Sequence, residues 1–253
     1  MTDNQKIYDS VEFSNFANRA DLLQEEELLL EKYFIKEKKT VEAGTAGGRI
    51  LFELKKKGYN SLFGYDFVKG FIDEAEKRNI DKSISFSVQD ASDLNYDDNM
   101  FDQAIYLQQI ICNIEDPDKR LKGIKEAYRI LNKNGVLLIS FCNFDSKKNE
   151  FVSRMFITYL KILRTITRKK INIQSLPWLK HAGKPNWNAF FDREPYNYWF
   201  KAEEVQKILI SVGFSIVAIG FPRNILEGTM KSDYNDLNDS DFDGHIYFVC
   251  KKQ

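Results

Sequence analysis

A short apolar segment that runs into a glycine-rich turn, at residues 40–49, limits the folds open to this chain. Its sequence, T-V-E-A-G-T-A-G-G-R, predicts a buried strand, a turn containing Gly44 and Gly48, and a helix that continues through Leu54. Glycine leaves the backbone N–H groups of such a turn accessible to a ligand, beside the positive end of the helix. Ordinary strand–helix turns also use glycine, so this feature needs support from elsewhere in the chain.

Acidic residues at corresponding places along the chain give that support. Glu42 stands two residues before Gly44, the next predicted strand ends in Asp66, and Asp90 follows the third strand. A carboxylate at the tip of the second strand of an α/β sheet can accept hydrogen bonds from both hydroxyls of a ribose. The three acids therefore indicate a nucleoside-containing ligand at this edge of the sheet.

The alternation of strands and helices predicts the fold class. Strands are expected near 40–44, 61–66, 83–88, 101–107 and 134–142, helices near 48–57, 69–79 and 117–131, and two further strands at 215–220 and 245–251. This order is typical of an α/β, doubly wound, mostly parallel seven-stranded sheet with helices on both faces. Before it, residues 21–34 predict an amphipathic helix, with leucines on one side and glutamates on the other.

An insertion after the fifth strand interrupts the alternation. Residues 151–168 form an amphipathic pattern: Val152, Met155, Phe156, Tyr159, Leu160, Leu163 and Ile166 on one face, with Arg154, Lys161 and Arg168 on the other. Residues 176–200 are dense in aromatics and proline. We expect a helical and aromatic cap at 145–197, between an N-terminal helical segment with the cofactor-binding half at 1–144 and the completion of the same domain at 198–253.

Composition narrows the classes of function. Lysine plus arginine and aspartate plus glutamate number 37 each, so no global charge favours nucleic acid. The three cysteines show neither zinc-site nor disulfide spacing, which is typical of a reducing compartment. The N-terminus lacks the pattern of a signal peptide, and no apolar run is long enough to span a bilayer. These features predict a cytoplasmic protein.

From residue 40 to about 144, and more loosely at 198–221, the chain resembles the class I S-adenosylmethionine-dependent methyltransferases, which share the Rossmann-like fold. The resemblance implies S-adenosylmethionine as cofactor, S-adenosylhomocysteine as product and no metal. It places Glu42 near the amino-acid moiety, Asp66 at the ribose and Asp90 at the adenine amino group. The full set of cofactor contacts that it implies is Tyr8, Glu42, Gly44, Ala46, Gly48, Asp66, Phe67, Asp90, Ala91 and Gln108.

A nicotinamide dehydrogenase would place similar features at the same edge of the sheet. Its G-x-G-x-x-G motif, counted from Gly44, requires glycine where this chain has Ala46 and Arg49. The methyltransferase resemblance is also imperfect, because Ala46 stands where glycine is usual. Cys112-Asn113 replaces the histidines that many small-molecule members carry after the fourth strand, and no N-P-P-Y signature is present.

The resemblance thus implies an enzyme that transfers a methyl group to the oxygen or nitrogen of a small-molecule acceptor. A tRNA- or protein-directed enzyme of the same fold and a catalytically silent cofactor-binding subunit are the alternatives. We expect Gln109, Trp187, Tyr196, Tyr198 and Trp199 to bind the acceptor. His181, within the aromatic cap, is the candidate general base, whereas His245 begins the last strand and is expected to be structural.

Two further questions stay open in the sequence. The amphipathic helix at 151–168 is expected to pack on the domain or line the pocket, with a membrane-surface role as the alternative. The oligomeric state is not determined by any pattern in the chain.

Overall fold

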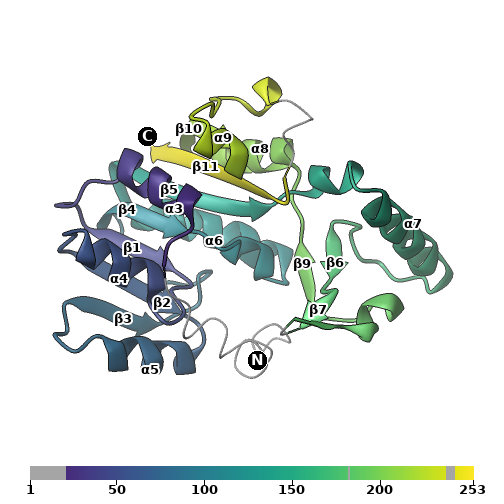
Figure 1. Cartoon of the computed structure of the whole chain (residues 1–253), viewed down its shortest axis with the longest axis horizontal. Coiled ribbons are helices and arrows are strands. Elements are labelled where there is room, and N and C mark those ends of the chain that lie inside the picture. Colours follow the sequence, from purple (N-terminus) through teal and green to yellow (C-terminus); the bar gives the residue numbers. More distant parts are fainter. Residues whose placement is uncertain (1–20, 182, 238–242) are drawn as a thin grey trace.

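The structure is a computed structural model that describes residues 21–181, 183–237 and 243–253. Its centre is a seven-stranded sheet in the order β10-β11-β5-β4-β1-β2-β3 (Figure 1). The strands are β1 (Thr40–Ala43), β2 (Leu62–Asp66), β3 (Ile84–Val88), β4 (Phe101–Tyr106), β5 (Leu131–Cys142), β10 (Phe214–Gly220) and β11 (His245–Lys252). The first five run parallel, while β11 is antiparallel to both of its neighbours. The predicted fold class is confirmed.

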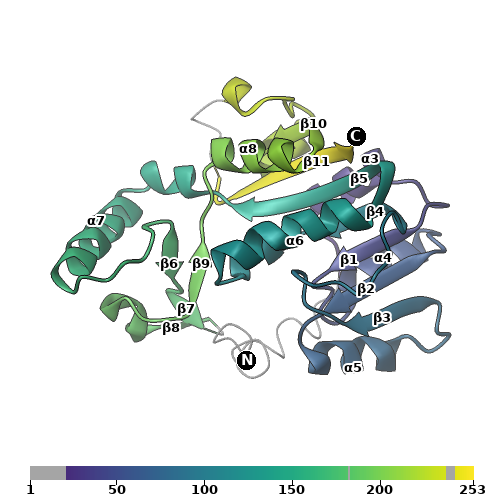
Figure 2. The same ribbon diagram turned by 180° about the vertical axis from the view of Figure 1, so that it is seen from behind.

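Helices cover both faces of this sheet. One face carries α3 (Gln24–Tyr33), α4 (Arg49–Lys56) and α9 (Pro222–Leu226), as Figure 1 shows. The opposite face carries α6 (Pro117–Ile130) and α8 (Ala202–Val212), seen in Figure 2. The remaining helix of this region, α5 (Lys69–Arg78), packs against β2 and β3. The Asp116 carboxylate caps α6 by accepting from the N–H groups of Asp118 and Lys119, which explains where that helix begins.

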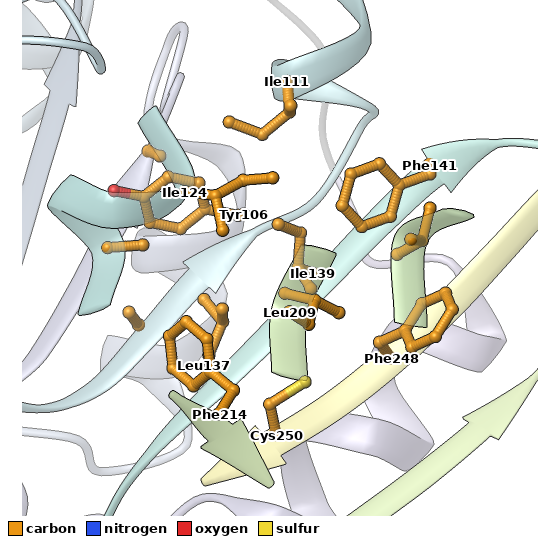
Figure 3. Packing of buried hydrophobic residues seen from close by; sticks show 14 of the residues in the cluster. Tyr106, Ile111, Ile124, Leu137, Ile139, Phe141, Leu209, Phe214, Phe248 and Cys250 are labelled. Carbon is orange, nitrogen blue, oxygen red and sulfur yellow. The ribbon is translucent and has the colours of Figure 1, made fainter. Parts of the chain in front are cut away.

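The main core lies between the sheet and the α6–α8 face. Figure 3 shows Tyr106, Leu137, Ile139, Phe141, Leu209, Phe214, Phe248 and Cys250 packed together there. The last strand, β11, contributes heavily because residues 246–250 are all buried. It lies between β5 and β10, inside the sheet, so β10 and β3 form the two edges.

Residues between β5 and α8 form the cap, which extends away from one end of the sheet (Figure 1). It contains η2 (Phe144–Lys148), α7 (Phe151–Ile166), η3 (Trp187–Phe191) and two small antiparallel pairs, β6 (Ser175–Pro177) with β9 (Tyr196–Tyr198) and β7 (Lys180–His181) with β8 (Lys184–Pro185). The chain leaves and rejoins the sheet at one place, where the Phe200 N–H donates to the Cys142 carbonyl at 2.8 Å and the Phe144 N–H donates to the Phe200 carbonyl at 2.7 Å.

The buried face of α7 differs from the face that the apolar pattern predicts. Ile157, Leu160 and Arg164 are buried, whereas most of the predicted stripe is exposed: Val152, Met155, Tyr159 and Ile166. Arg164 is accommodated because its guanidinium forms two hydrogen bonds with the buried Asp192 carboxylate, at 2.7 and 2.9 Å. The face of α7 that packs on the cap thus contains a paired charge, and most of the apolar stripe points to solvent instead.

Candidate functional site

A cavity of about 540 Å³ lies between the carboxyl ends of the parallel strands and the cap. This volume is within the range of small-molecule pockets, about 300–1,000 Å³. The sheet side contributes Glu42, Gly44, Thr45, Ala46, Arg49, Tyr65, Asp66, Phe67, Phe71, Gln89, Ala91, Gln108, Gln109, Ile110 and Asn113. The cap side contributes Lys147, Ser153, Phe156, Ile157, Leu176, Pro177, Trp178, Leu179, Lys180, Asn197 and Trp199.

The glycine turn after β1 forms one wall of this cavity. Its backbone is left-handed at Gly44, Ala46 and Gly48, with φ of 60°, 46° and 81°. A Cβ atom on Gly44 would lie 2.2 Å from Cδ1 of Ile110, so the Ile110 side chain would have to move, and the positive φ itself favours glycine there. Ala46 adopts the left-handed conformation in spite of its side chain. Its N–H donates to the Asp66 carboxylate at 3.0 Å, which helps to hold the turn.

Asp66, at the end of β2, is only 4% exposed and lines the cavity. Its carboxylate also accepts a hydrogen bond from the Val68 N–H at 2.9 Å. Burial raises the pKa of Asp66 to about 6, against the lowering effect of these backbone hydrogen bonds. The side chain is therefore a desolvated acceptor at the place where the sequence predicts a ribose contact.

Glu42 lies on β1 below the turn and is likewise 4% exposed. The Thr45 hydroxyl donates to its carboxylate at 2.6 Å, across the first half of the turn. Burial raises the pKa of Glu42 to about 8, and the hydrogen bond from Thr45 and the positive charge of Arg49 oppose this shift. The glutamate thus stabilises the shape of the turn and also lines the cavity.

A buried ion pair lies beside the turn, and no pattern in the sequence predicts it. Glu26 of α3 is fully buried, and the Arg49 guanidinium donates to both of its carboxylate oxygens, at 2.6 and 2.9 Å. Gln108 Nε2 and the Leu23 N–H also donate to Glu26, at 2.6 and 2.9 Å. A glutamate three residues after a helix start is a recognised capping signal, which marks Glu26 but not its distant partners.

Gln108 and Gln109 follow β4 and both line the cavity. Both have a left-handed backbone, with φ of 56° and 58°. Two consecutive non-glycine residues in this conformation are costly and are typical of functional sites. Gln108 contacts Glu26, and the Gln109 N–H donates to the Ser140 hydroxyl at 3.3 Å. The pair therefore has a fixed backbone where the cavity passes from the sheet to the cap.

The cap side of the cavity is largely apolar and aromatic. Phe156 and Ile157 come from α7, Leu176 from β6, and Trp199 from the segment that returns to the sheet. The Lys147 ammonium lies 4.5 Å from the Trp199 ring centroid, close enough for a cation–π interaction. An acceptor in this part of the cavity would contact aromatic rings more than charged groups.

Several predicted acceptor residues are placed elsewhere. Trp187 is 71% exposed and does not line the cavity. Tyr196 is buried within the cap, where its hydroxyl donates to the Asp192 carbonyl. Tyr198 is buried under the Arg120 guanidinium, at 4.1 Å from the ring centroid, and donates to Glu204 at 2.9 Å. The structure brings Gln109 and Trp199 into the cavity, but not these three.

Among the predicted cofactor residues, Gly48 and Asp90 do not line the cavity. Asp90 is exposed. Desolvation tends to raise the pKa of its carboxyl group, but the hydrogen bonds from the Ser92 N–H and hydroxyl and the charge of Lys119 outweigh this effect and lower the pKa. Gln89 and Ala91, its neighbours, do line the cavity. Tyr8 and the side chain of His181 lie outside the part of the chain that the structure describes. Within that part, no group of three or more His, Cys, Asp or Glu side chains could hold a metal ion.

The seven-stranded sheet, with β11 antiparallel to both of its neighbours, has the Rossmann-like fold of the class I S-adenosylmethionine-dependent methyltransferases. Residues 41–139 match the family model described as a methyltransferase domain. The resemblance drawn from the sequence is thereby confirmed for the fold and for this domain.

Individual relatives agree with this assignment. The chain is 33% identical over 161 residues to the demethylmenaquinone methyltransferase of Bacteroides fragilis, covering 62% of this chain and 58% of that protein. It thus spans a little over half the length of this relative. A solved methyltransferase structure from Methanosarcina mazei has 21% identity and a TM-score of 0.65, over 92% of this chain and 98% of that one. Another, from Thermotoga maritima, has 20% identity and a TM-score of 0.57, over 98% and 99%. At these identities the structures establish the shared fold.

Proposed function

We propose that this protein is an S-adenosylmethionine-dependent methyltransferase whose acceptor is a small molecule held against the cap. The observation that carries the proposal is the continuity of one cavity. It extends from the glycine turn and the buried Asp66 to the apolar surface formed by Phe156, Leu176 and Trp199. The cavity could therefore hold a polar nucleoside beside the turn and an apolar acceptor against the cap.

The residues around the turn fit the cofactor. Asp66 is a buried carboxylate that lines the cavity, and an acid at this place in the sheet is suited to accept from two ribose hydroxyls. Phe67 and Ala91 would lie against the adenine ring, and Glu42 would act beside the amino-acid moiety through the turn that it shapes. Gln108 would lie beside the sulfonium end, because it follows β4 and lines the cavity next to Gln109.

When bound, S-adenosylmethionine supplies a methyl group on a sulfonium: an electron pair of the acceptor atom forms the new bond to the methyl carbon, and the electrons of the carbon–sulfur bond return to sulfur. The chain's main task is to hold the acceptor in line with that bond and to exclude water. Gln109 and Trp199 border the space where the acceptor would lie, and the apolar wall keeps it dry. A hydroxyl, a protonated amine or a ring carbon that accepts the methyl also needs a base for the proton that it loses.

The nature of the cap side indicates an acceptor with an apolar body. The Bacteroides fragilis relative is a demethylmenaquinone methyltransferase by name, so demethylmenaquinone is the first acceptor to test. The protein would be incubated with methyl-labelled cofactor and this acceptor, and with lipid, aqueous-metabolite, RNA and protein fractions of a cell extract. Label in a small molecule is expected. Label only in RNA or protein would contradict the acceptor class, and cofactor binding without any transfer would favour the silent subunit.

We propose His181 as the general base, because it precedes the β7–β8 turn of the cap and its neighbour Lys180 lines the cavity. His181→Ala should then reduce turnover by roughly a hundredfold or more, with the loss recovered at high pH if the acceptor ionises by itself. The matched control is His245→Ala, on β11. Turnover of His181→Ala within a few-fold of the wild type would remove His181 from the site and leave positioning as the mechanism.

A further inference from the structure

The outer face of α7 carries an unusual exposed apolar stripe. Its members, with exposed fractions from 42% to 77%, are Phe151, Val152, Met155, Tyr159, Ile162 and Ile166. At 100° per residue they fall within an arc of about 100° on the helix. Single exposed apolar residues are ordinary, but a continuous stripe over four turns of one helix marks an interaction surface. In both views α7 lies at the far edge of the cap from the sheet (Figures 1 and 2).

Aromatic residues of η3 extend this stripe to a second element. Trp187, Phe190 and Phe191 are 71%, 45% and 66% exposed. The Phe190 ring lies 6.1 Å from that of Phe156, and the Tyr159 hydroxyl donates to the Phe190 carbonyl at 2.5 Å. The stripe and these three aromatics thus form one surface, here named the apolar cap face.

This face lies in a strongly basic part of a neutral chain. Between residues 151 and 193 there are nine basic side chains and a single acidic one, Asp192, which is buried in its pair with Arg164. Because the whole chain is balanced, the remainder carries the opposite excess of acid. The basic residues are Arg154, Lys161, Arg164, Arg168, Lys169, Lys170, Lys180, Lys184 and Arg193. All but Arg164 and the half-buried Lys169 are exposed.

The apolar cap face also connects to the cavity. Phe156 lines the cavity while its ring contacts Tyr159 and Phe190, which belong to the face. Leu179 lines the cavity and is 51% exposed at the surface. Apolar side chains are therefore in contact from this face to the lining of the cavity.

We infer that the apolar cap face docks on the surface of an anionic lipid membrane. Apolar side chains at 100° spacing, flanked by lysine and arginine, are the chemistry of a helix that lies in the headgroup region. Anionic lipids complement the local positive charge. No helix in the described ranges is long and apolar enough to cross a bilayer, so the contact is with its surface. Resting on the proposed function, this docking also assigns the acceptor to molecules with an apolar body dissolved in the bilayer.

A second copy of the chain is a poorer occupant of the same face. In a symmetric dimer the face would meet itself, and the same excess of positive charge would stand on both sides. An anionic membrane offers the opposite charge and an apolar interior together. Charge complementarity thus favours lipid.

The test is cosedimentation of the full chain with vesicles of phosphatidylcholine, with and without about one-third phosphatidylglycerol. The wild type should be retained on anionic vesicles, and less so at high salt. Ile162→Glu should lower the partition coefficient by roughly tenfold or more, because a charge enters the stripe that the lipid would cover. Its matched control is Ile210→Glu, a helical isoleucine on α8 with nearly the same exposure, 54% against 57%, which should bind as the wild type does.

A second pair of variants tests the charge. Replacing Arg154, Lys161 and Arg168 together by glutamine should weaken retention by roughly a hundredfold. The same replacement at the exposed Lys36, Lys125 and Lys133 should have little effect. Calorimetry with S-adenosylhomocysteine on each variant separates this proposal from the function: unchanged cofactor binding shows that the fold and the methyltransferase site are intact.

Three outcomes would overturn the inference. The wild type could stay in the supernatant with anionic vesicles. Ile210→Glu could lose retention as fully as Ile162→Glu, which would make the binding non-specific. Sedimentation velocity could show a dimer that Ile162→Glu dissociates, without vesicle binding, which would assign the face to self-association.

Discussion

At the scale of single residues, two buried carboxylates dominate the site. Asp66 and Glu42 both have a raised pKa because burial disfavours their charged forms. Asp66 faces the cavity as a hydrogen-bond acceptor, while Glu42 is engaged by Thr45 within the turn. Burial is therefore expected to affect ligand binding through Asp66 and the stability of the fold through Glu42.

Cofactor affinity should depend on the protonation of Asp66. Two ribose hydroxyls need a carboxylate, so affinity should fall by up to tenfold per pH unit below about 6, the pKa of the free site. Asp66→Ala should lose about 3 kcal/mol of binding, roughly a hundredfold. Calorimetry with S-adenosylhomocysteine between pH 5 and 8 measures both effects.

The control for this change is Asp73→Ala on α5, an exposed aspartate paired with Lys69. It should bind the cofactor as the wild type does, at every pH. Equal affinity of wild type and Asp66→Ala would contradict the ribose assignment. Tight NADH binding by the wild type would contradict the cofactor class as a whole.

Glu42 should make the folded state less stable as pH rises. Its pKa in the folded state, about 8, lies above the value of 4.5 for an exposed glutamate, so the native protein holds the proton more firmly. The stabilisation is complete below pH 4.5 and is lost as pH rises to 8, by on the order of 4 kcal/mol. Urea unfolding of wild type and Glu42→Gln at pH 5 and 8 isolates this effect. A difference between the two proteins that does not change with pH would show that Glu42 is ionised throughout.

At the scale of elements, a buried ion pair joins α3 to α4 beside their shared apolar core. Glu26 has no exposure to water, and Arg49 supplies the charge that offsets its burial. Removing only one partner of such a pair costs about 3–5 kcal/mol, because the other charge stays buried alone. Arg49→Met should therefore destabilise the fold by that amount.

Urea unfolding would measure the loss of unfolding free energy in Arg49→Met. The control is Lys207→Met, which breaks an exposed pair with Glu203 and should cost less than about 1 kcal/mol. Adding Glu26→Met to Arg49→Met should restore part of the stability. A cost as small as that of Lys207→Met would show that water reaches Glu26 in solution.

Elements were predictable from sequence where one local pattern determines them. The parallel strands, α4, α5 and α6 begin and end within a few residues of the expected positions, because glycine turns and apolar periodicity mark them. The buried face of α7 could not be predicted in this way, because Arg164 is buried there only by pairing with Asp192, 28 residues away. Glu26 and Arg49 present the same difficulty. A charged residue in a helical pattern is predicted to face solvent, because the sequence does not reveal a buried partner that is distant along the chain.

The site shows the same division. Glu42, Gly44, Asp66 and Ala91, which the resemblance places at the cofactor, lie in or just after strands of the sheet, and all four line the cavity. The cap residues are positioned by irregular turns and short strands, for which sequence offers only composition. Aromatic density therefore predicts the cap but not which rings face the cavity: Trp178 lines it, whereas the predicted Tyr196 does not.

At the scale of the whole molecule, β11 joins β10 to the five parallel strands of the sheet. It pairs with β5 and β10, and its Phe248 is fully buried, with its ring 6.0 Å from that of Phe141 (Figure 3). Phe248→Ala should destabilise the protein by about 3–5 kcal/mol through loss of apolar burial and creation of a cavity. Phe191→Ala, on the apolar cap face, should change stability by less than about 0.5 kcal/mol. Chemical denaturation compares the two, and similar costs would show that the cap face is packed in solution.

The place where the cap joins the sheet has a consequence for how such proteins diversify. Its first and last residues meet at a single hydrogen-bonded junction, formed by Cys142, Phe144 and Phe200. An insertion whose ends already touch can be lengthened, shortened or exchanged while the strands on either side keep their register. Descendants of one ancestor could thus acquire new acceptors by replacing this segment alone, and inherit the cofactor machinery unchanged.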